Sequence, residues 1–303
     1  MSVITNIPDA FTVQFESSFD AALQQMASTL RDAVTVKSAS GERLRLNNRG
    51  LVEVQEINTR GGDTVQQDLD IELVSVFPQA ADVTLAVDEF DPAHLGSLAL
   101  PSSDLVQDEA AAVNRFIDNE IVAAFTGVRY LGKTGTTSEA FPTSTQRIAV
   151  TYGPAGSSGN LGLNFEKIAN AAFRLDTDEV PQGNRFLGIR AKQMEDLYLD
   201  IIANHATDMS SIKMLEGQRA VSEICGFKII QNQRFTVDGS DIASVIAWHK
   251  SQVVLGIWND RKVYADILPT QRHALQVRTT INVGATRRRN EAVVEILCDQ
   301  SPA

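Results

Sequence analysis

The sequence predicts an α+β fold, and three stretches of the 303-residue chain lead to that prediction. Residues 104–126 have apolar side chains at three- and four-residue spacing, the pattern of one long amphipathic helix. Residues 34–87 contain alternating, mostly polar segments that are typical of strands, and the last third of the chain is also strand-rich. Helices and strands that occupy separate stretches are typical of α+β folds.

The helix predicted over residues 104–126 is expected to be the spine of a domain. Its apolar stripe consists of Leu105, Val113, Phe116, Ile117, Ile121 and Ala124. Asp104 and Gln107 have the spacing of a capping box, and Gly127 can end the helix with a positive φ angle. At 1.5 Å rise per residue the helix is a rod of about 35 Å, which spans a small domain.

Residues 127–134, GVRYLGKT, match the phosphate-loop pattern letter for letter. A phosphate-binding loop needs a buried strand before it and a helix that begins directly after its lysine, here Lys133. In this chain a helix precedes the motif, and residues 135–142 are rich in turn-forming residues. The context therefore predicts a helix end and a surface loop, and a nucleotide-binding enzyme is kept as an alternative.

The composition favours a soluble, acidic protein that stays inside the cell that makes it. At 43% hydrophobic residues the chain can bury a large core, and its length suggests about two domains. No stretch is apolar over the length of a membrane span, and the first residues lack signal-peptide features. The formal net charge of −11 argues against a protein that grips nucleic acid, because such binding needs concentrated Lys and Arg.

The N-terminal segment is expected to be an extended arm followed by an amphipathic helix. Residues 1–14 show no clear period. The residues that then recur at helical spacing, up to about position 33, are Phe15, Phe19, Leu23, Met26 and Leu30. A helix with one apolar face needs another surface to cover it.

Residues 38–92 are predicted to contain a long, polar hairpin. Its strand segments are RLRLNN, LVEVQEIN, LDIELVSVF and DVTLAV, and residues 60–63, RGGD, form the turn between the second and third. A hairpin this polar cannot form its own core. It must therefore project into solvent or lie on another molecule.

The rest of the chain alternates helices and strands and then becomes strand-rich. Residues 127–162 are rich in Gly, Thr and Ser around the short strand RIAVTY, and are the best boundary between two lobes. Asn164 is expected to cap a helix whose inner residues are Phe165, Ile168, Ala169, Ala172 and Phe173. The segments predicted after it are strand RFLGIRA, helix KQMEDLYLDIIANH, and strands GFKIIQN, ASVIAWHK, VVLGIW, KVYADILP, HALQVRTTINVGA and AVVEILCD.

No pattern of side chains predicts catalysis, a metal or a cofactor. The four histidines have no partner at ligand spacing: His94, His205, His249 and His273. The acidic residues of 176–179 lack the spacing of a metal loop and are expected to form a solvated turn. The two cysteines are flanked by apolar residues and predict core positions in a reducing compartment: Cys225 and Cys298.

Four segments of the second half, in this order, are similar to segments of one known family: VPQGNRFLGIRAKQMEDLYLD, SEICGFKIIQNQRF, AWHKSQVVLGIW and INVGATRRRNEAVVEIL. With the hairpin and the long helix upstream, they resemble the major capsid proteins of tailed bacteriophages with the Hong Kong 97-type shell fold. The segments correspond to that family's strand and short helix, its Gly-Phe strand, its helix facing the capsomer axis, and its closing Gly-Ala turn with the last strand. The resemblance covers nearly the whole chain.

The resemblance implies how the chain is divided. Residues 1–37 would be an N-terminal arm with the amphipathic helix, and residues 38–92 the E-loop hairpin. Residues 93–160 would form a peripheral domain with the spine helix and a long sheet. Residues 161–264 would form an axial α/β domain, and the strands of residues 265–303 would return to the peripheral domain.

The resemblance also implies a structural protein without catalytic, cofactor or metal residues. Copies would form hexameric and pentameric capsomers and an icosahedral head around double-stranded DNA, contacted non-specifically. Assembly would take place in the host cytoplasm, without a membrane, together with scaffolding, portal and decoration proteins. An encapsulin-like shell protein, which shares the fold but holds enzyme cargo, is an alternative.

In that family the E-loop lies over the neighbouring subunit, so its turn, the arm helix and the one basic run supply candidate contacts. The candidates for contact with neighbouring subunits are Phe15, Phe19, Leu23, Arg60, Asp63, Arg287, Arg288 and Arg289. No lysine occurs between Lys37 and Lys133, so the covalent E-loop crosslink of some members is not expected. Few residues precede the hairpin, so a separate scaffolding protein is expected.

Overall fold

The computed structural model describes residues 27–54, 56, 60, 67–87, 104–154, 156, 159–205, 223–270 and 274–301. These residues divide into two compact units. Unit 1 contains the described residues of Asp82–Asn114 and Arg261–Thr280, and unit 2 those of Ser28–Ala81, Arg115–Asp260 and Ile281–Ala303. The Gly-, Thr- and Ser-rich region of residues 127–162 falls within unit 2.

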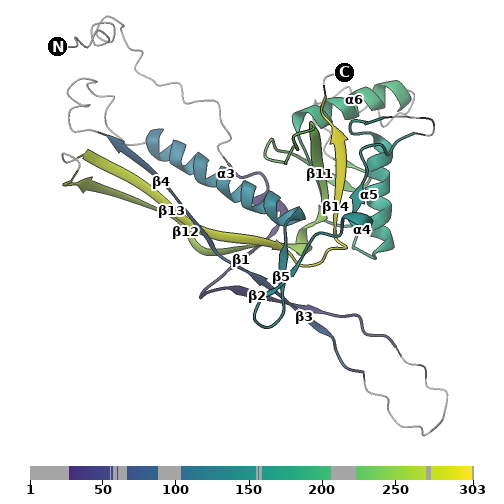
Figure 1. Cartoon of the computed structure of the whole chain (residues 1–303), viewed down its shortest axis with the longest axis horizontal. Helices are drawn as coiled ribbons and strands as arrows, with labels where there is room; N and C mark the ends of the chain where they lie inside the picture. Colours follow the sequence, from purple (N-terminus) through teal and green to yellow (C-terminus); the bar gives the residue numbers. More distant parts are fainter. Residues whose placement is uncertain are drawn as a thin grey trace, which may run out of the picture. The chain divides into compact units, whose positions relative to one another are not determined.

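The helices and strands follow the order of Figure 1. The helices are the 3-10 turns η1 (Arg31–Ala33) and η3 (Lys250–Gln252), with α3 (Asp104–Thr126), α4 (Thr143–Gln146), α5 (Phe165–Thr177) and α6 (Ala191–His205). The strands are β1 (Thr35–Ser38), β2 (Leu44–Arg49), β3 (Ile71–Val76), β4 (Gln79–Val87), β5 (Arg129–Leu131), β6 (Thr137–Glu139), β7 (Arg147–Ile148), β8 (Arg185–Ile189), β9 (Glu223–Ile224), β10 (Phe227–Gln231), β11 (Ile242–His249), β12 (Val253–Leu268), β13 (Ala274–Arg287) and β14 (Val293–Asp299).

The described strands form three sheets. Their strand orders are β1-β12-β13-β4, β7-β14-β11-β8-β10-β9 and β2-β3-β5-β6. The six-stranded sheet mixes parallel and antiparallel pairs, since β8 is parallel to β10 and antiparallel to β11. Helix α5 packs against β14 of this sheet. The α+β prediction is therefore confirmed.

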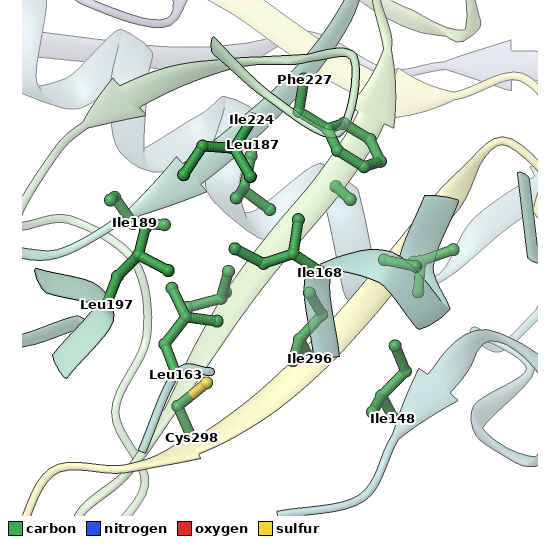
Figure 2. Packing of buried hydrophobic residues seen from close by; sticks show 14 of the residues in the cluster. Ile148, Leu163, Ile168, Leu187, Ile189, Leu197, Ile224, Phe227, Ile296 and Cys298 are labelled. Atoms are coloured by element: carbon green, nitrogen blue, oxygen red, sulfur yellow. The ribbon is translucent and has the colours of Figure 1, made fainter. Parts of the chain in front are cut away.

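The main core lies between the six-stranded sheet and helices α5 and α6. Figure 2 shows its buried side chains, which converge from both helices and from several strands. Successive side chains of a strand point to opposite faces, and most of those of β11 are buried on both faces. Val245 and Ala247 belong to the core cluster, whereas the ring of Trp248 packs at a tilt against Phe125 of α3, with centroids 4.6 Å apart.

The predicted helix over residues 104–126 is confirmed with the same bounds as α3. Its buried apolar residues include Ala111, Val113, Ile117, Ile121 and Phe125. Glu109 and Asp118 fall outside the predicted apolar stripe, yet the structure buries both side chains completely. Both accept hydrogen bonds from other segments, which explains why they are tolerated inside.

Asp118 joins α3 to two distant segments of unit 2. It accepts hydrogen bonds from the Ser28 hydroxyl at 2.5 Å, the Leu30 amide at 3.3 Å and the Asn232 side-chain amide at 2.8 Å. Glu109 plays a smaller part within unit 1, where it accepts a 2.5 Å hydrogen bond from the hydroxyl of Thr279 on β13. The helix is therefore held by polar contacts as well as by its apolar stripe.

Helix α5 begins after Asn164, as predicted, and two of its predicted inner residues, Ile168 and Ala172, pack in or against the core, but the two phenylalanines do not. Asn164 accepts a hydrogen bond from the Lys167 amide at 2.8 Å. Phe165 and Phe173, expected inside, have exposed fractions of 36% and 66%, while Lys167 is fully buried. The Lys167 ammonium donates to four backbone carbonyls, those of Val150, Leu161, Gly162 and Leu297, at 2.7–3.0 Å. Burial lowers the pKa of this lysine, and the four acceptors stabilise its charge.

The N-terminal helix expected up to position 33 falls mostly outside the described residues. Within them, residues 27–30 are not helical, and Arg31–Ala33 form only a 3-10 turn. Leu30 is nevertheless fully buried, because its amide is bound to Asp118. A polar contact from a distant helix therefore determines the local conformation here.

The C-terminal strands depart from the expected arrangement in two ways. The segment AWHKSQVVLGIW, likened to a helix, is strand β11, turn η3 and the start of β12. Residues 265–303 do not all return to one sheet, because β13 lies beside β12 and β4 whereas β14 pairs with β11 in the six-stranded sheet. Strand β12 also joins two predicted strands, VVLGIW and KVYADILP, into one of 16 residues.

Replacing Asp118 by Ala should lower the free energy of unfolding by about 2–4 kcal/mol, because the buried Leu30 amide and Asn232 side chain lose their acceptor. Chemical denaturation of unit 2, followed through Trp248 fluorescence, measures this. Asn119→Ala is the matched control, since Asn119 is exposed on the same turn of α3. Equal stability of the two variants would contradict the role given to Asp118.

Candidate interaction surfaces

The predicted hairpin is built on an ordered base. Strands β2 and β3 pair antiparallel from Leu44 opposite Val76 to Arg49 opposite Ile71. One further hydrogen bond, from the Gly50 amide to the Asp70 carbonyl at 2.8 Å, extends the pairing. Residues 51–54, expected in a strand, are not in one.

Beyond its base the hairpin exposes apolar side chains. Leu51, Val52 and Val54 have exposed fractions of 88%, 66% and 97%. Isolated exposed apolar residues are common, but three within four residues form a continuous strip. This strip is available to another surface.

Arg129 of β5 binds the hairpin base to the rest of unit 2. Its guanidinium is only 6% exposed and forms ion pairs with Glu72 of β3, at 2.9 Å, and with Glu139 of β6. It also donates to the Arg288 carbonyl at 2.6 Å. Asn48 of β2 donates to that same carbonyl at 2.8 Å. The charge-assisted bonds of Arg129 join β5, β3 and β6 to the turn after β13, and the Asn48 hydrogen bond adds β2.

Arg287, the first residue of the basic run, is a buried structural residue. It donates to Asn290 Oδ1 at 2.7 Å and to the Gly127 carbonyl, and its guanidinium lies 5.2 Å from the ring centre of Phe141. A cation is favourable at the C-terminus of α3, where the helix dipole is negative. Burial, and then the neighbouring Arg129 charge, lower the pKa of Arg287 to about 10. Its partners lie inside its own subunit and not on a neighbour.

Arg288 and Arg289 are half-exposed and lie against strand β2. Arg288 donates to Asn48 Oδ1 and to the Asn47 carbonyl, each at 3.0 Å, and Arg289 donates to the Arg49 carbonyl. The residues that line the pocket between them, of about 350 Å³, are Asn47, Asn48, Arg49, Gln252, Arg288 and Arg289. The sequence showed the run of arginines but not its contact with β2.

The other candidate contacts are placed only in part. Arg60 is exposed in a turn, in agreement with a position on the hairpin tip. Four candidates lie outside the described residues: Phe15, Phe19, Leu23 and Asp63. The structure therefore brings together Arg288, Arg289 and the hairpin base.

The phosphate-loop pattern lies in a hairpin turn. Gly127 follows α3, residues 129–131 form β5, and Gly132 and Gly135 have positive φ angles in the turn before β6. The Lys133 carbonyl accepts a 3.0 Å hydrogen bond from Arg43. Because a strand and not a helix follows Lys133, the turn lacks the converging amides that hold phosphates.

The acidic turn and His249 have ordinary protein partners, whereas His94 and His273 lie outside the described residues. Asp176 pairs with Arg185 at 2.7 Å, and Asp178 accepts from Gln146 at 2.8 Å. His249 lies 2.9 Å from the Ser251 hydroxyl, and burial lowers its pKa. Burial raises the pKa of the Cys298 thiol to about 12. No metal-binding group of His, Cys, Asp or Glu occurs within the described part of the chain, and none of its helices is long and apolar enough to cross a membrane.

The chain was compared with known families, sequences and structures. A family model for phage capsid proteins matches residues 7–300. No curated protein sequence matches. The capsid of cyanophage P-SCSP1u has a TM-score of 0.68 at 13% identity, over 97% of this chain and 94% of that one. The capsid asymmetric unit of cyanophage Pam1 has a TM-score of 0.67 at 12% identity, over 100% and 99%. The mature capsid of bacteriophage PhiM1 has a TM-score of 0.65 at 10% identity, over 95% and 92%.

Replacing Arg129 by Met should lower the free energy of unfolding by about 2–3 kcal/mol, because Glu72 and Glu139 lose their shared cation in a largely buried site. The hairpin base should loosen first. Hydrogen exchange of β2 and β3 amides measures this directly. Arg129→Lys keeps the charge but not the forked geometry and should give an intermediate effect. Unchanged exchange in both variants would contradict the proposed link.

Replacing Lys133 by Ala should change neither stability nor nucleotide binding, since the Lys133 side chain is exposed in a turn without a phosphate-binding helix. Isothermal titration with Mg²⁺ and ATP checks this on both proteins. Saturable heat from the wild type that disappears in the variant would show that the turn does bind phosphate.

Proposed function

The chain belongs to the phage capsid protein family, and we propose that it is the major capsid protein of a tailed-phage head, whose shell is built from hexameric and pentameric capsomers around double-stranded DNA. The predicted Hong Kong 97-type fold and the absence of an enzymatic role are confirmed by the family match and the full-length similarity of fold. The protein is a component of the virion capsid and assembles into shells with copies of itself.

The observation that supports assembly through the hairpin is its exposed apolar strip at residues 51–54. Leu51, Val52 and Val54 are 66–97% exposed in the subunit. Covering an aliphatic side chain of this size completely contributes about 1.5–3 kcal/mol. A closed lattice repeats each contact over several neighbours, so a modest contact is sufficient. The hairpin is thus proposed to be the E-loop, lying over the next subunit.

The division of the chain follows from the same proposal. Residues 1–37 form the arm, 38–92 the E-loop and 93–160 the peripheral domain. Of the segment 161–264 that the resemblance assigns to the axial domain, residues 161–252 are kept there, together with β14, which pairs with β11. Strands β12 and β13 pair in the other sheet and are assigned to the peripheral domain.

The contact candidates are proposed in three groups. Arg60 and Asp63 would touch a neighbour from the hairpin turn, and Phe15, Phe19 and Leu23 would do so from the arm. Arg288 and Arg289 would serve at the hairpin base, where they are half-exposed. Arg287 is removed from this group because it is buried in its own subunit.

Contact with the packaged DNA is proposed to be weak and non-specific. The formal net charge of −11 disfavours adhesion to phosphates, because such binding depends on Lys and Arg that displace counterions. An acidic wall can therefore confine DNA without holding it in place. Scaffolding, portal and decoration proteins are proposed as further partners, and assembly in the host cytoplasm as the route, on the basis of the resemblance.

Removing the hairpin tip should abolish shell formation and leave the subunit folded. In this variant an Asn-Gly turn replaces residues 52–68, which keeps the pairing of β2 and β3 in register. We expect an unchanged unfolding temperature and only monomers or small oligomers by negative-stain microscopy and size-exclusion chromatography. The wild-type chain, prepared in parallel, should give capsomers or shells. Shells of wild-type size from the shortened chain would contradict the role of the hairpin.

A further inference from the structure

The pocket at the hairpin base has an unusual composition for an acidic protein. Its lining contains three arginines, Arg49, Arg288 and Arg289, and no carboxylate. None of the three forms an ion pair with any residue in the described part of the chain. Arg129, beside them, pairs with two carboxylates. The pocket is therefore a place where positive charge is concentrated and not neutralised.

The backbone of β2 holds the pocket ready for a ligand. Arg288 donates to the Asn47 carbonyl, and Arg289 to the Arg49 carbonyl. Each guanidinium keeps further N–H groups for another acceptor, since it has five. Side chains that are already positioned lose less freedom when they bind. An anion with two oxygens matches this arrangement, because carboxylate and guanidinium can form two parallel bonds.

The adjoining cavity, of about 470 Å³, adds an apolar surface. Leu51, Val180, Pro181 and Ala292 line it together with Arg49 and Arg289. Five carboxylates line it too: Asp70, Glu72, Asp178, Glu179 and Glu291. Glu72 is bound to Arg129 and Asn48, and Asp178 accepts from Gln146, so the excess of positive charge is confined to the smaller pocket. A partner that fits both cavities therefore offers carboxylates to the smaller pocket and apolar side chains to the apolar lining of the larger one.

The hairpin of this same protein has that composition. Residues 51–70 contain one basic residue, Arg60, and five acidic ones, namely Glu53, Glu56, Asp63, Asp68 and Asp70. Glu53 and Glu56 are exposed on either side of Val54, which is 97% exposed. In an extended chain Glu56 is about 20 Å from Gly50, at roughly 3.3 Å per residue, too far to return to the pocket beside that glycine.

We propose that the arginine pocket, formed by Arg49, Arg288 and Arg289, receives Glu53 and Glu56 from the hairpin of a second copy of this chain. The inference rests on the proposed function and adds the receiving surface and its chemistry. A nucleic-acid phosphate has similar oxygens, but it would leave Val54 and the apolar lining of the larger cavity uncovered. Charge pairing at a partly exposed rim contributes mainly specificity and register, which a lattice of identical subunits requires.

Charge reversal on each side tests the pairing. The pocket variant is Arg49→Glu with Arg289→Glu, and the hairpin variant is Glu53→Arg with Glu56→Arg. Each alone places like charges in contact, and we expect shell yield to fall about tenfold or more, which corresponds to about 1.4 kcal/mol. A chain that carries all four substitutions restores opposite charges at every contact, in hexamers and in pentamers. This combined variant should therefore give shells when neither separate variant does.

Three controls make the result interpretable. Arg45→Glu changes an exposed arginine of β2 outside the pocket and should assemble like the wild type. Each variant should unfold at the wild-type temperature. If the pocket variant does not, Arg49→Glu alone replaces it, because the Arg49 side chain has no described hydrogen bond. In addition, Glu56→Cys with Arg49→Cys should give an intersubunit disulfide on oxidation of the assembled shell.

Several outcomes would overturn the inference. A combined variant that assembles no better than the two separate variants, or shells without the crosslink, would show that the hairpin does not enter the pocket. A pocket variant that assembles normally but retains less DNA would indicate a phosphate site instead. If the wild type itself forms no capsomers or shells, the proposed function fails, whereas normal wild-type shells with no rescue contradict only the pairing.

Discussion

The ion pairs of Arg129 with Glu72 and Glu139 are the constraint on which the interaction surfaces depend. The guanidinium is largely buried, and breaking such a pair leaves charges without a partner at a cost of several kcal/mol. The same side chain holds the carbonyl of Arg288, so the hairpin base and the turn after β13 are kept together. The hairpin can then present an uncovered strip while its base remains fixed.

The six-stranded sheet and the hairpin differ in how much of their apolar surface is buried. The six-stranded sheet, with α5 and α6, buries apolar side chains on both faces of β11. In the hairpin just beyond Gly50, the side chains of Leu51, Val52 and Val54 are exposed. Under the proposed function, these side chains gain burial only in the assembled shell.

The three consecutive arginines after β13 have two different roles. Arg287 is the last residue of the strand and turns inward to the C-terminus of α3, where carbonyls and a ring receive it. Arg288 and Arg289 turn to β2 and form the pocket with Arg49. One basic run therefore fastens the spine helix and also creates a surface of opposite charge to the rest of this acidic chain.

The sequence by itself determined the elements whose signals are local. The spacing of apolar residues predicted α3 with its observed bounds, and turn residues around Lys133 argued against a phosphate-binding loop. The order of segments identified the family that the comparison found. These features depend on neighbouring residues, which the sequence contains directly.

Only the tertiary structure decided which side chains face inward and which strands pair. Lys167 is buried and Phe173 exposed because four carbonyls from separate segments meet the ammonium. Asp118 is buried because Ser28, Leu30 and Asn232 reach it. Strand β14 joins the six-stranded sheet through β11, and the arginine pocket arises where β2 meets the turn after β13. Each outcome depends on partners distant in the chain, so no local pattern of residues specifies it.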